Sequence, residues 1–223
     1  MGVNRAGFAI TDDALTRESA KQEVIRRYFR YRCEYVMGLT NKETVQRVEL
    51  LIKDFNLEPE NRSVVEPARK AAMDAQEKKG GSEGIYCGGA IELKDKTVVT
   101  GSNSPHLHAA SSLILHAIKH LAEIPDKIKL LPPNIIESVR NLKTEVLNEK
   151  TLSLDLLEAL IVLSISATTN PAAQLAMEKL TDLQGCEVHM THIPTPGDEA
   201  GLRRLGVNLT SDPNFSTKDL FVT

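Results

Sequence analysis

Apolar residues recur at helical spacing through the first third of the chain, which predicts three helices. Thr11 or Asp12 can cap the first helix, which should end at Gly38. The second helix opens with a capping box formed by Thr40 and Glu43. The apolar residues expected on its inner face are Val45, Val48, Leu51 and Phe55.

A third helix is predicted near Pro67, because the fixed φ of proline suits the first helical turn. The small alanine side chains of this helix allow it to pack closely against a neighbouring helix or strand. The run KKGGSEG at 78–84 is typical of a flexible link and marks the predicted boundary. We therefore expect a helical arm over residues 1–80 and an α/β domain over 81–223.

Strict alternation begins after this link and predicts a β-hairpin over 85–100 that turns at 94–96. Later segments predict two more strands, at 186–193 and 207–210. Helices are expected to start near residues 104, 135, 153, 171 and 198. The predicted fold class is mixed α/β, with helices packed on a small, mostly antiparallel or mixed sheet and an N-terminal helical arm.

The composition of the chain argues against some kinds of partner and function. The chain has 223 residues and a formal net charge of −3, which argues against a nucleic-acid partner. Cys33, Cys87 and Cys186 are far apart and form no Cys-x-x-Cys pair, so a reducing, cytoplasmic compartment is expected. The most apolar segment, Leu156 to Ala167, is too short to cross a bilayer. It predicts a buried core helix and no membrane partner.

Two short segments share one pattern, in which small polar residues precede a proline that opens a helix. The polar residues are Ser102, Asn103 and Ser104 in the first segment, and Thr168, Thr169 and Asn170 in the second. Such residues are ordinary N-caps. If the two helix starts converge, their amide groups instead form a cradle for a phosphate or carboxylate. Neither segment matches GxxxxGK[ST] or GxGxxG, so no nucleotide fingerprint is present.

Histidines cluster beside the first polar segment. His106 and His108 are weak catalytic candidates, because a neutral imidazole there can donate to an anion or accept a proton. Surface exposure and capping are the alternative interpretation. The remaining histidines are His116 and His120, on the outer face of a helix, and His189 and His192, on opposite faces of a strand. No metal site is predicted, since no HExxH or comparable ligand set occurs.

The chain resembles the bacterial family called domain of unknown function 1846, in its C-terminal half. The matching blocks include KQEVIRRYFRYRCEY, CGGAIELKDKTVVTGSNSPHLHAASS and LSISATTNPAAQLAMEKL. The resemblance implies that Asn103, Ser104, His108, Thr169 and Asn170 belong to a shared pattern with no assigned role. It also implies that a Gly-rich, P-loop-like segment belongs to an N-terminal half that this chain lacks. No cofactor is evident here, and a nucleotide is expected only through that missing half.

Three functions remain open at this stage. The first is a ligand-binding or partner domain of a nucleotide-using protein, with a small anionic ligand at the two helix starts. The second is a stand-alone hydrolase or transferase that uses a histidine base. The third is a structural dimerisation module. Whether the chain is an enzyme is left open, and we expect a homo-oligomer or association with an N-terminal half.

Overall fold

A computed structural model describes residues 13–149 and 152–216. The chain divides into two compact units between Arg62 and Ser63. This division differs from the boundary expected near residue 80, because the helix α3 (Val65–Glu77) packs against the strand β1 (Gly88–Glu92) of the second unit. The expected caps Thr11 and Asp12 lie outside the described residues.

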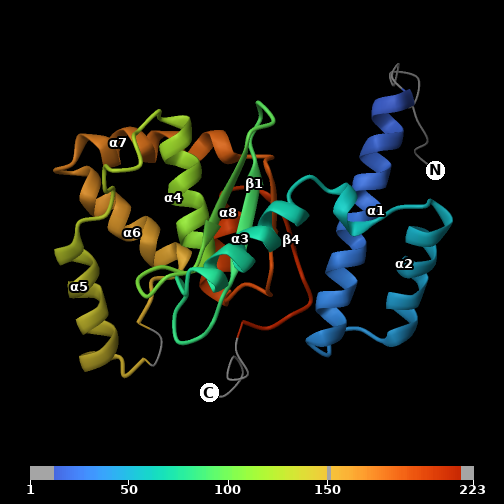
Figure 1. The fold of residues 1–223 in the computed structure, drawn as a ribbon, viewed down its shortest axis with the longest axis horizontal. Coiled ribbons are helices and arrows are strands. Elements are labelled where there is room, and N and C mark those ends of the chain that lie inside the picture. The colour runs from blue at the N-terminus through green and yellow to red at the C-terminus, as the bar shows by residue number, and fades with distance from the viewer. Residues whose placement is uncertain (1–12, 150–151, 217–223) are drawn as a thin grey trace, which may run out of the picture. The chain divides into compact units, whose positions relative to one another are not determined.

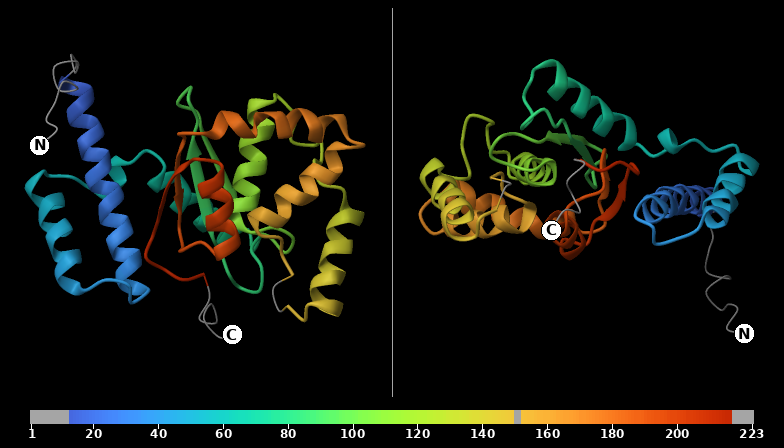
Figure 2. Two further views of the ribbon diagram at one scale, coloured as in Figure 1. Left: turned by 180° about the vertical axis from the view of Figure 1, so that it is seen from behind. Right: turned by 90° about the horizontal axis from the view of Figure 1, so that it is seen from below.

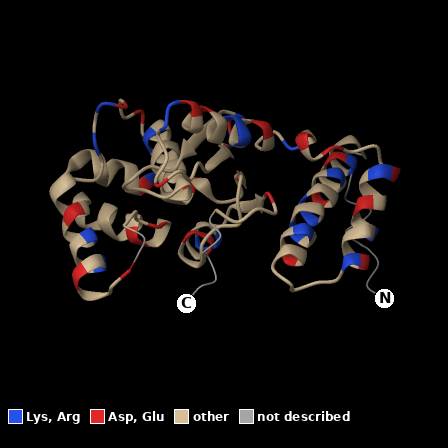
Figure 3. Ribbon diagram, turned by 60° about the horizontal axis from the view of Figure 1, so that its bottom comes forward, with Lys and Arg blue, Asp and Glu red and all other residues tan. Residues whose placement is uncertain are grey.

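The first unit contains two long helices, α1 (Asp13–Val36) and α2 (Lys42–Asp54), and a short 3₁₀ turn, η2 (Pro59–Asn61). Both basic and acidic residues occur along α1, whose second half is rich in arginine (Figure 3). The side chain of Asn41 accepts a hydrogen bond from the Thr44 amide, so Asn41 caps α2 and the expectation for Thr40 is wrong. The core of this unit includes Ile25, Phe29, Val45 and Val48.

The second unit is built on a four-stranded sheet in the order β2-β1-β3-β4. Strand β1 pairs antiparallel with β2 (Val98–Ser102) and with β3 (Glu187–Met190), and β3 pairs parallel with β4 (Asn208–Ser211). The fold is therefore mixed α/β with a mixed sheet, as predicted (Figure 1). The 85–100 hairpin is confirmed, with Gly89 opposite Gly101.

Helices cover both faces of this sheet, with α3 on one face and α4 (Ala109–Leu121) on the other (Figure 2). Glycines permit this close approach. A Cβ at Gly88 would lie 2.4 Å from the Ala68 carbonyl oxygen of α3, and a Cβ at Gly101 would lie 2.4 Å from the Leu113 nitrogen of α4. The predicted close packing of the alanine-rich third helix is therefore confirmed.

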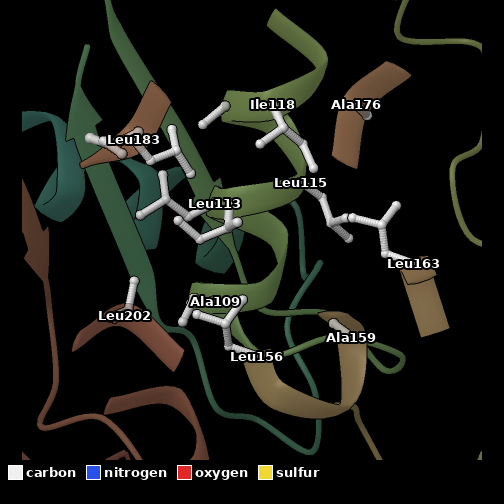
Figure 4. Close-up of a cluster of buried hydrophobic side chains, with 14 of the residues drawn as sticks. Ala109, Leu113, Leu115, Ile118, Leu156, Ala159, Leu163, Ala176, Leu183 and Leu202 are labelled. Carbon is white, nitrogen blue, oxygen red and sulfur yellow. The ribbon is translucent and has the colours of Figure 1, made fainter. Parts of the chain in front are cut away.

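The remaining helices complete the second unit, and most of them contact α4. They are α5 (Pro133–Asn141), the π-turn η3 (Leu142–Val146), α6 (Leu156–Ala167), α7 (Pro171–Glu178), the 3₁₀ turn η4 (Lys179–Leu183) and α8 (Pro196–Arg204). Leu113 and Ile118 of α4 belong to the buried cluster that these helices share (Figure 4). The predicted core helix α6 is buried on one side only: Leu156 and Leu163 lie in the core, whereas Ile161 and Ile165 are 62% and 50% exposed. No helix in the described part of the chain is long and apolar enough to cross a membrane.

Candidate functional site

One edge of the sheet gathers polar residues from all four strands. Strands β2, β3 and β4 run in the same direction, so their carboxyl ends meet at this edge, and β1 begins there. We call it the carboxyl edge. In open α/β sheets, ligands bind outside the carboxyl ends of the strands. The residues that flank the strands here are Cys87 before β1, Asn103 after β2, Thr191 and His192 after β3, and Asp212 after β4.

The segment that follows β2 is tied down by its own side chains. The Asn103 side chain accepts a hydrogen bond from the Cys87 amide (2.8 Å) and donates one to the Ile85 carbonyl (3.0 Å). Ser104 Oγ accepts from the amides of His106 and Leu107. Both side chains therefore hold the turn in shape, and the half-buried Ser102 ends β2.

The helix after this segment begins later than the sequence predicts. Ser104 and Pro105 were expected as N-cap and first residue, but α4 starts at Ala109 with His108 as its N-cap. Leu107 instead forms a parallel bridge with Leu154, and the His108 amide donates to the Leu154 carbonyl at 2.9 Å. This pairing keeps the chain extended up to His108. It also brings the start of α6 beside the start of α4.

His108 meets a buried carboxylate at this point. Its Nδ1 lies 2.8 Å from Oδ2 of Asp198, and the two side chains are 18% and 1% exposed. The same carboxylate accepts from the Thr195 hydroxyl (2.8 Å) and from the Leu156 amide (2.9 Å). The starts of α4, α6 and α8 therefore converge on Asp198. Because His108 makes no capping bond, its side chain does not satisfy the first-turn amides of α4.

The contacts of His108 and Asp198 determine the protonation state of each side chain. Burial acts to raise the pKa of Asp198, but the hydrogen bond and charge of His108, with those from Thr195 and the Leu156 amide, hold it below its ordinary value. Burial acts to lower the pKa of His108, and the hydrogen bond and charge of Asp198 outweigh it, so that pKa is raised above 6.5. Asp198 is therefore ionised near neutral pH. It orients an imidazole that can both take up and release a proton.

The charge of Asp198 also affects the pKa values of two other buried groups, His192 and Cys87. Burial, opposed by the charge of Asp198 and assisted by that of His108, lowers the pKa of His192 to about 4. His192 is therefore neutral, and its buried Nδ1 has no hydrogen-bond partner among the described residues. Burial and the charge of Asp198 raise the pKa of the Cys87 thiol to about 12. A neutral thiol is a poor nucleophile, so Cys87 is not an activated cysteine in this state.

The second polar segment does not join this site. Asn170 caps α7 as predicted, accepting from the Ala172 amide at 3.0 Å, and it donates to the Lys129 carbonyl. Thr168 and Thr169, however, follow the last residue of α6, whereas the site lies at its first residue. Twelve helical residues separate the two ends by about 18 Å. The expected cradle formed by both segments is therefore wrong, and α8 supplies the converging helix start.

Other histidines lie outside the pair. His106 is exposed and lines a cavity together with Ser104. His116 and His120 are exposed, and His116 Nδ1 donates to the Thr100 carbonyl at 2.9 Å. Within residues 13–149 and 152–216 no three His, Cys, Asp or Glu side chains are grouped closely enough to hold a metal ion.

A second histidine–carboxylate contact lies on the other side of β3. His189 Nε2 is 3.6 Å from Oδ1 of Asp212, which Arg69 of α3 also contacts at 2.8 Å. Burial acts to raise the pKa of Asp212, but bonds and charge from His189 and Arg69 hold it far below its ordinary value. His189 is fully buried, and the contact of Arg69 with Asp212 ties α3 to the sheet.

The fold and the site together define a mixed α/β protein whose βα turns bring a buried histidine–aspartate pair to the carboxyl edge of its sheet. The chain belongs to the DUF1846 family. The model described as "Domain of unknown function DUF1846, C-terminal" matches residues 60–221, and its N-terminal counterpart matches residues 1–56. The expectation that the chain corresponds to the C-terminal half alone is therefore wrong for its first 56 residues.

Curated relatives of this chain occur in Clostridium botulinum. A UPF0371 protein of strain Alaska E43 / Type E3 is 46% identical over 222 residues, which cover 99% of this chain and 44% of that protein. A UPF0371 protein of strain ATCC 19397 / Type A is 44% identical over 221 residues, with the same coverage. The chain thus spans less than half the length of these relatives. Their names indicate no ligand or reaction.

Proposed function

We propose that this chain is a cytoplasmic domain that binds a small anionic substrate at the carboxyl edge, where His108 acts as a general base in hydrolysis or group transfer. The observation that carries the proposal is the buried Asp198, which fixes the His108 ring through Nδ1. When Nδ1–H donates to a carboxylate, the neutral imidazole presents its other nitrogen as a proton acceptor.

The surroundings of the pair favour a negatively charged substrate. Helix starts carry partial positive charge, and those of α4 and α8 both follow strands at this edge. The start of α8 is capped by Thr195 and that of α6 by Asp155, whereas α4 lacks a side-chain cap. The start of α4 therefore adds its partial positive charge beside the His108 imidazole, although its first residues, Ala109 and Ala110, are themselves buried.

We expect inorganic phosphate to bind near His108. In an NMR titration, phosphate should shift the ring signals of His108 and raise its pKa further, because a second anion favours the protonated ring. The variant His108→Gln should weaken phosphate binding about tenfold, the cost of losing a charge-assisted hydrogen bond. His120→Gln, at an exposed histidine near the other end of α4, is the matched control. Phosphate shifts that leave His108 unmoved, or binding unchanged in His108→Gln, would remove the proposal.

The rate of any turnover identified later should rise with pH through the His108 pKa, which lies above 6.5. The direction follows from the role, since a general base must be unprotonated to accept a proton.

A second candidate function, partner binding, is favoured by the apolar surface of the first unit. Contrary to the sequence prediction, Leu51 and Phe55 are 41% and 59% exposed, and Leu39 and Leu50 are 72% and 59% exposed. We call these four residues the arm surface. Residues 1–56 match the N-terminal family model, and the relatives carry further chain that this one does not match. The partner we propose is that further chain.

The test is sedimentation of this chain mixed with the part of the Alaska E43 relative that it does not match. We expect a 1:1 complex, which Phe55→Asp should abolish because a buried unpaired carboxylate is costly. Met73→Asp, at a methionine of α3 that is 61% exposed, controls for the added charge. Failure to form the complex, or self-association of this chain through the arm surface, counts against this candidate.

A further inference from the structure

A cavity of about 460 Å³ lies beside α4 in the second unit. Its volume falls within the range of roughly 300–1,000 Å³ that is typical of small-molecule sites. One face of α4 lines it with Ser112, Leu115, His116 and Lys119, which are spaced as neighbours on a helix surface. This face is distinct from the start of α4 that carries His108, and His108 does not line the cavity.

The remaining lining is mostly apolar. The apolar residues are Leu107, Ile128, Leu130, Leu131, Pro133 and Ile136. Leu107 precedes α4, and the others come from the connection before α5 or from α5 itself. The Asn170 side chain fixes this connection by donating to the Lys129 carbonyl at 3.2 Å. An apolar body can therefore be enclosed between α4 and this connection.

The lining of the cavity includes one buried charged side chain, that of Lys119. Lys119 is only 9% exposed, and its ammonium donates to the Asp126 carbonyl at 2.8 Å. No carboxylate in the described ranges, 13–149 and 152–216, lies within 4 Å of that ammonium. An ammonium group has three donors, and the only acceptor that the described residues supply is this neutral carbonyl.

Lys143 shows how this fold treats a buried lysine elsewhere. It is 4% exposed, and its ammonium lies 2.9 Å from a Glu158 oxygen and 3.3 Å from a Glu149 oxygen. It also donates to the Ser153 carbonyl. Because removing a charge from water is expensive without a counter-charge, the contrast with Lys119 points to a missing anion.

The acidic residues that line the cavity do not supply this anion. The side chain of Asp126 is exposed, and only its backbone carbonyl meets Lys119. Glu137 is exposed and pairs with Arg140 at 3.5 Å. No arginine lines the cavity. Of the two lysines that line the cavity, Lys119 is buried and Lys129 is exposed. One buried cation beside an apolar wall fits a monoanion better than a phosphate, which recruits several closely placed cations or an arginine fork.

We propose that the cavity binds a small organic acid, whose carboxylate pairs with Lys119 and whose apolar body lies against Leu115, Leu131 and Ile136. Ser104 and His106, both singled out in the sequence, also line this cavity. The proposal uses none of the chemistry of the His108–Asp198 pair, so either can fail without the other.

The test uses octanoate as probe and octan-1-ol as its uncharged counterpart, in calorimetric titrations of the whole chain. We expect octanoate to bind more tightly than octan-1-ol. Lys119→Met should weaken octanoate binding about tenfold or more and leave octan-1-ol binding nearly unchanged, because only the charged contact is lost. Lys127→Met, at an exposed lysine that does not line the cavity, makes the same charge change and should have no effect.

Ile136→Trp provides a second variant that does not depend on the charge. It fills the cavity and should weaken the binding of both probes, while far-UV circular dichroism reports whether the fold is kept. Absence of octanoate binding overturns the proposal. Equal binding of the two probes, or octanoate binding unaffected by either Lys119→Met or Ile136→Trp, overturns it as well.

Discussion

Replacing Asp198 by alanine is expected to lower the free energy of unfolding of the second unit by about 3–5 kcal/mol. The side chain is 1% exposed and accepts hydrogen bonds from three groups: His108, Thr195 and the Leu156 amide. Alanine leaves the buried Leu156 amide and the half-buried His108 ring and Thr195 hydroxyl without their acceptor, at a desolvation cost. Because they come from the starts of three helices, the loss falls on the junction of α4, α6 and α8.

Urea unfolding measures this change, and native-state hydrogen exchange locates it. The Leu156 amide should exchange faster in Asp198→Ala, since its acceptor is gone. Asp126→Asn is the control, at an exposed carboxylate, and should change stability by less than about 0.5 kcal/mol. If Asp198→Ala were as stable as the control, the central role given to this carboxylate would be wrong.

Asp198→Asn separates the charge from the packing, because the amide keeps the shape of the carboxylate. Without the charge of Asp198, only the charge of Asp155 opposes the effect of burial on His108, so the pKa of His108 should fall. The ring signals of His108, followed by NMR across pH, report the direction. An unchanged His108 pKa would contradict the assignment of its shift to Asp198.

Gly101→Ala is expected to cost about 1–3 kcal/mol or more, through overpacking between β2 and α4. A Cβ at this position would lie 2.4 Å from the Leu113 nitrogen and 2.5 Å from its Cα. Both atoms belong to the helix backbone, so the helix as a whole must move away from the strand. Relief by a side-chain rotation is not available.

Gly80→Ala is the matched control for this substitution. The nearest atom to a Cβ there is the Ala75 carbonyl oxygen at 3.8 Å, an ordinary contact. Thermal unfolding of the two variants should differ by several degrees, with Gly101→Ala lower. Equal unfolding temperatures would show that β2 and α4 pack less closely than the structure indicates.

Local patterns predicted the strands well. Alternation over 85–100 gave the hairpin, the segment at 186–193 contains β3, and the segment at 207–210 overlaps β4. The helix start at 109 was missed because its cause is not local: Leu107 pairs with Leu154, 47 positions along the chain. Propensity alone favoured the nearer Ser104–Pro105.

The candidate site was half predicted. His108 was named, but its partner Asp198 lies 90 residues away and was missed. A usable signal did exist, since Thr195 and Pro196 repeat the polar-then-proline pattern directly after a predicted strand. The segment at 168–171 has that pattern after a helix. Only turns that follow parallel-running strands are brought to the same sheet edge, so what precedes the turn decides whether it can contribute.

The exposed residues of the arm surface were predicted to be buried, because helical spacing identifies an apolar face without identifying what covers it. Val45 and Val48 are buried within the first unit, whereas Leu51 and Phe55 are not. The amphipathic pattern thus identifies apolar residues that favour burial, and the described residues bury only some of them.

The tight connection between β1 and β2 lies at the opposite end of the strands from His108 and Asp198. It is formed by exposed residues 94–96, with Lys96 at φ +71°, and its chain is tied to the sheet by the bond from the Leu93 amide to the Thr97 carbonyl. Exposed loop tips tolerate insertions, so an affinity peptide can be inserted or a fluorescent label attached at this loop. A tag inserted at residues 94–96 would leave the residues around the His108 imidazole unchanged.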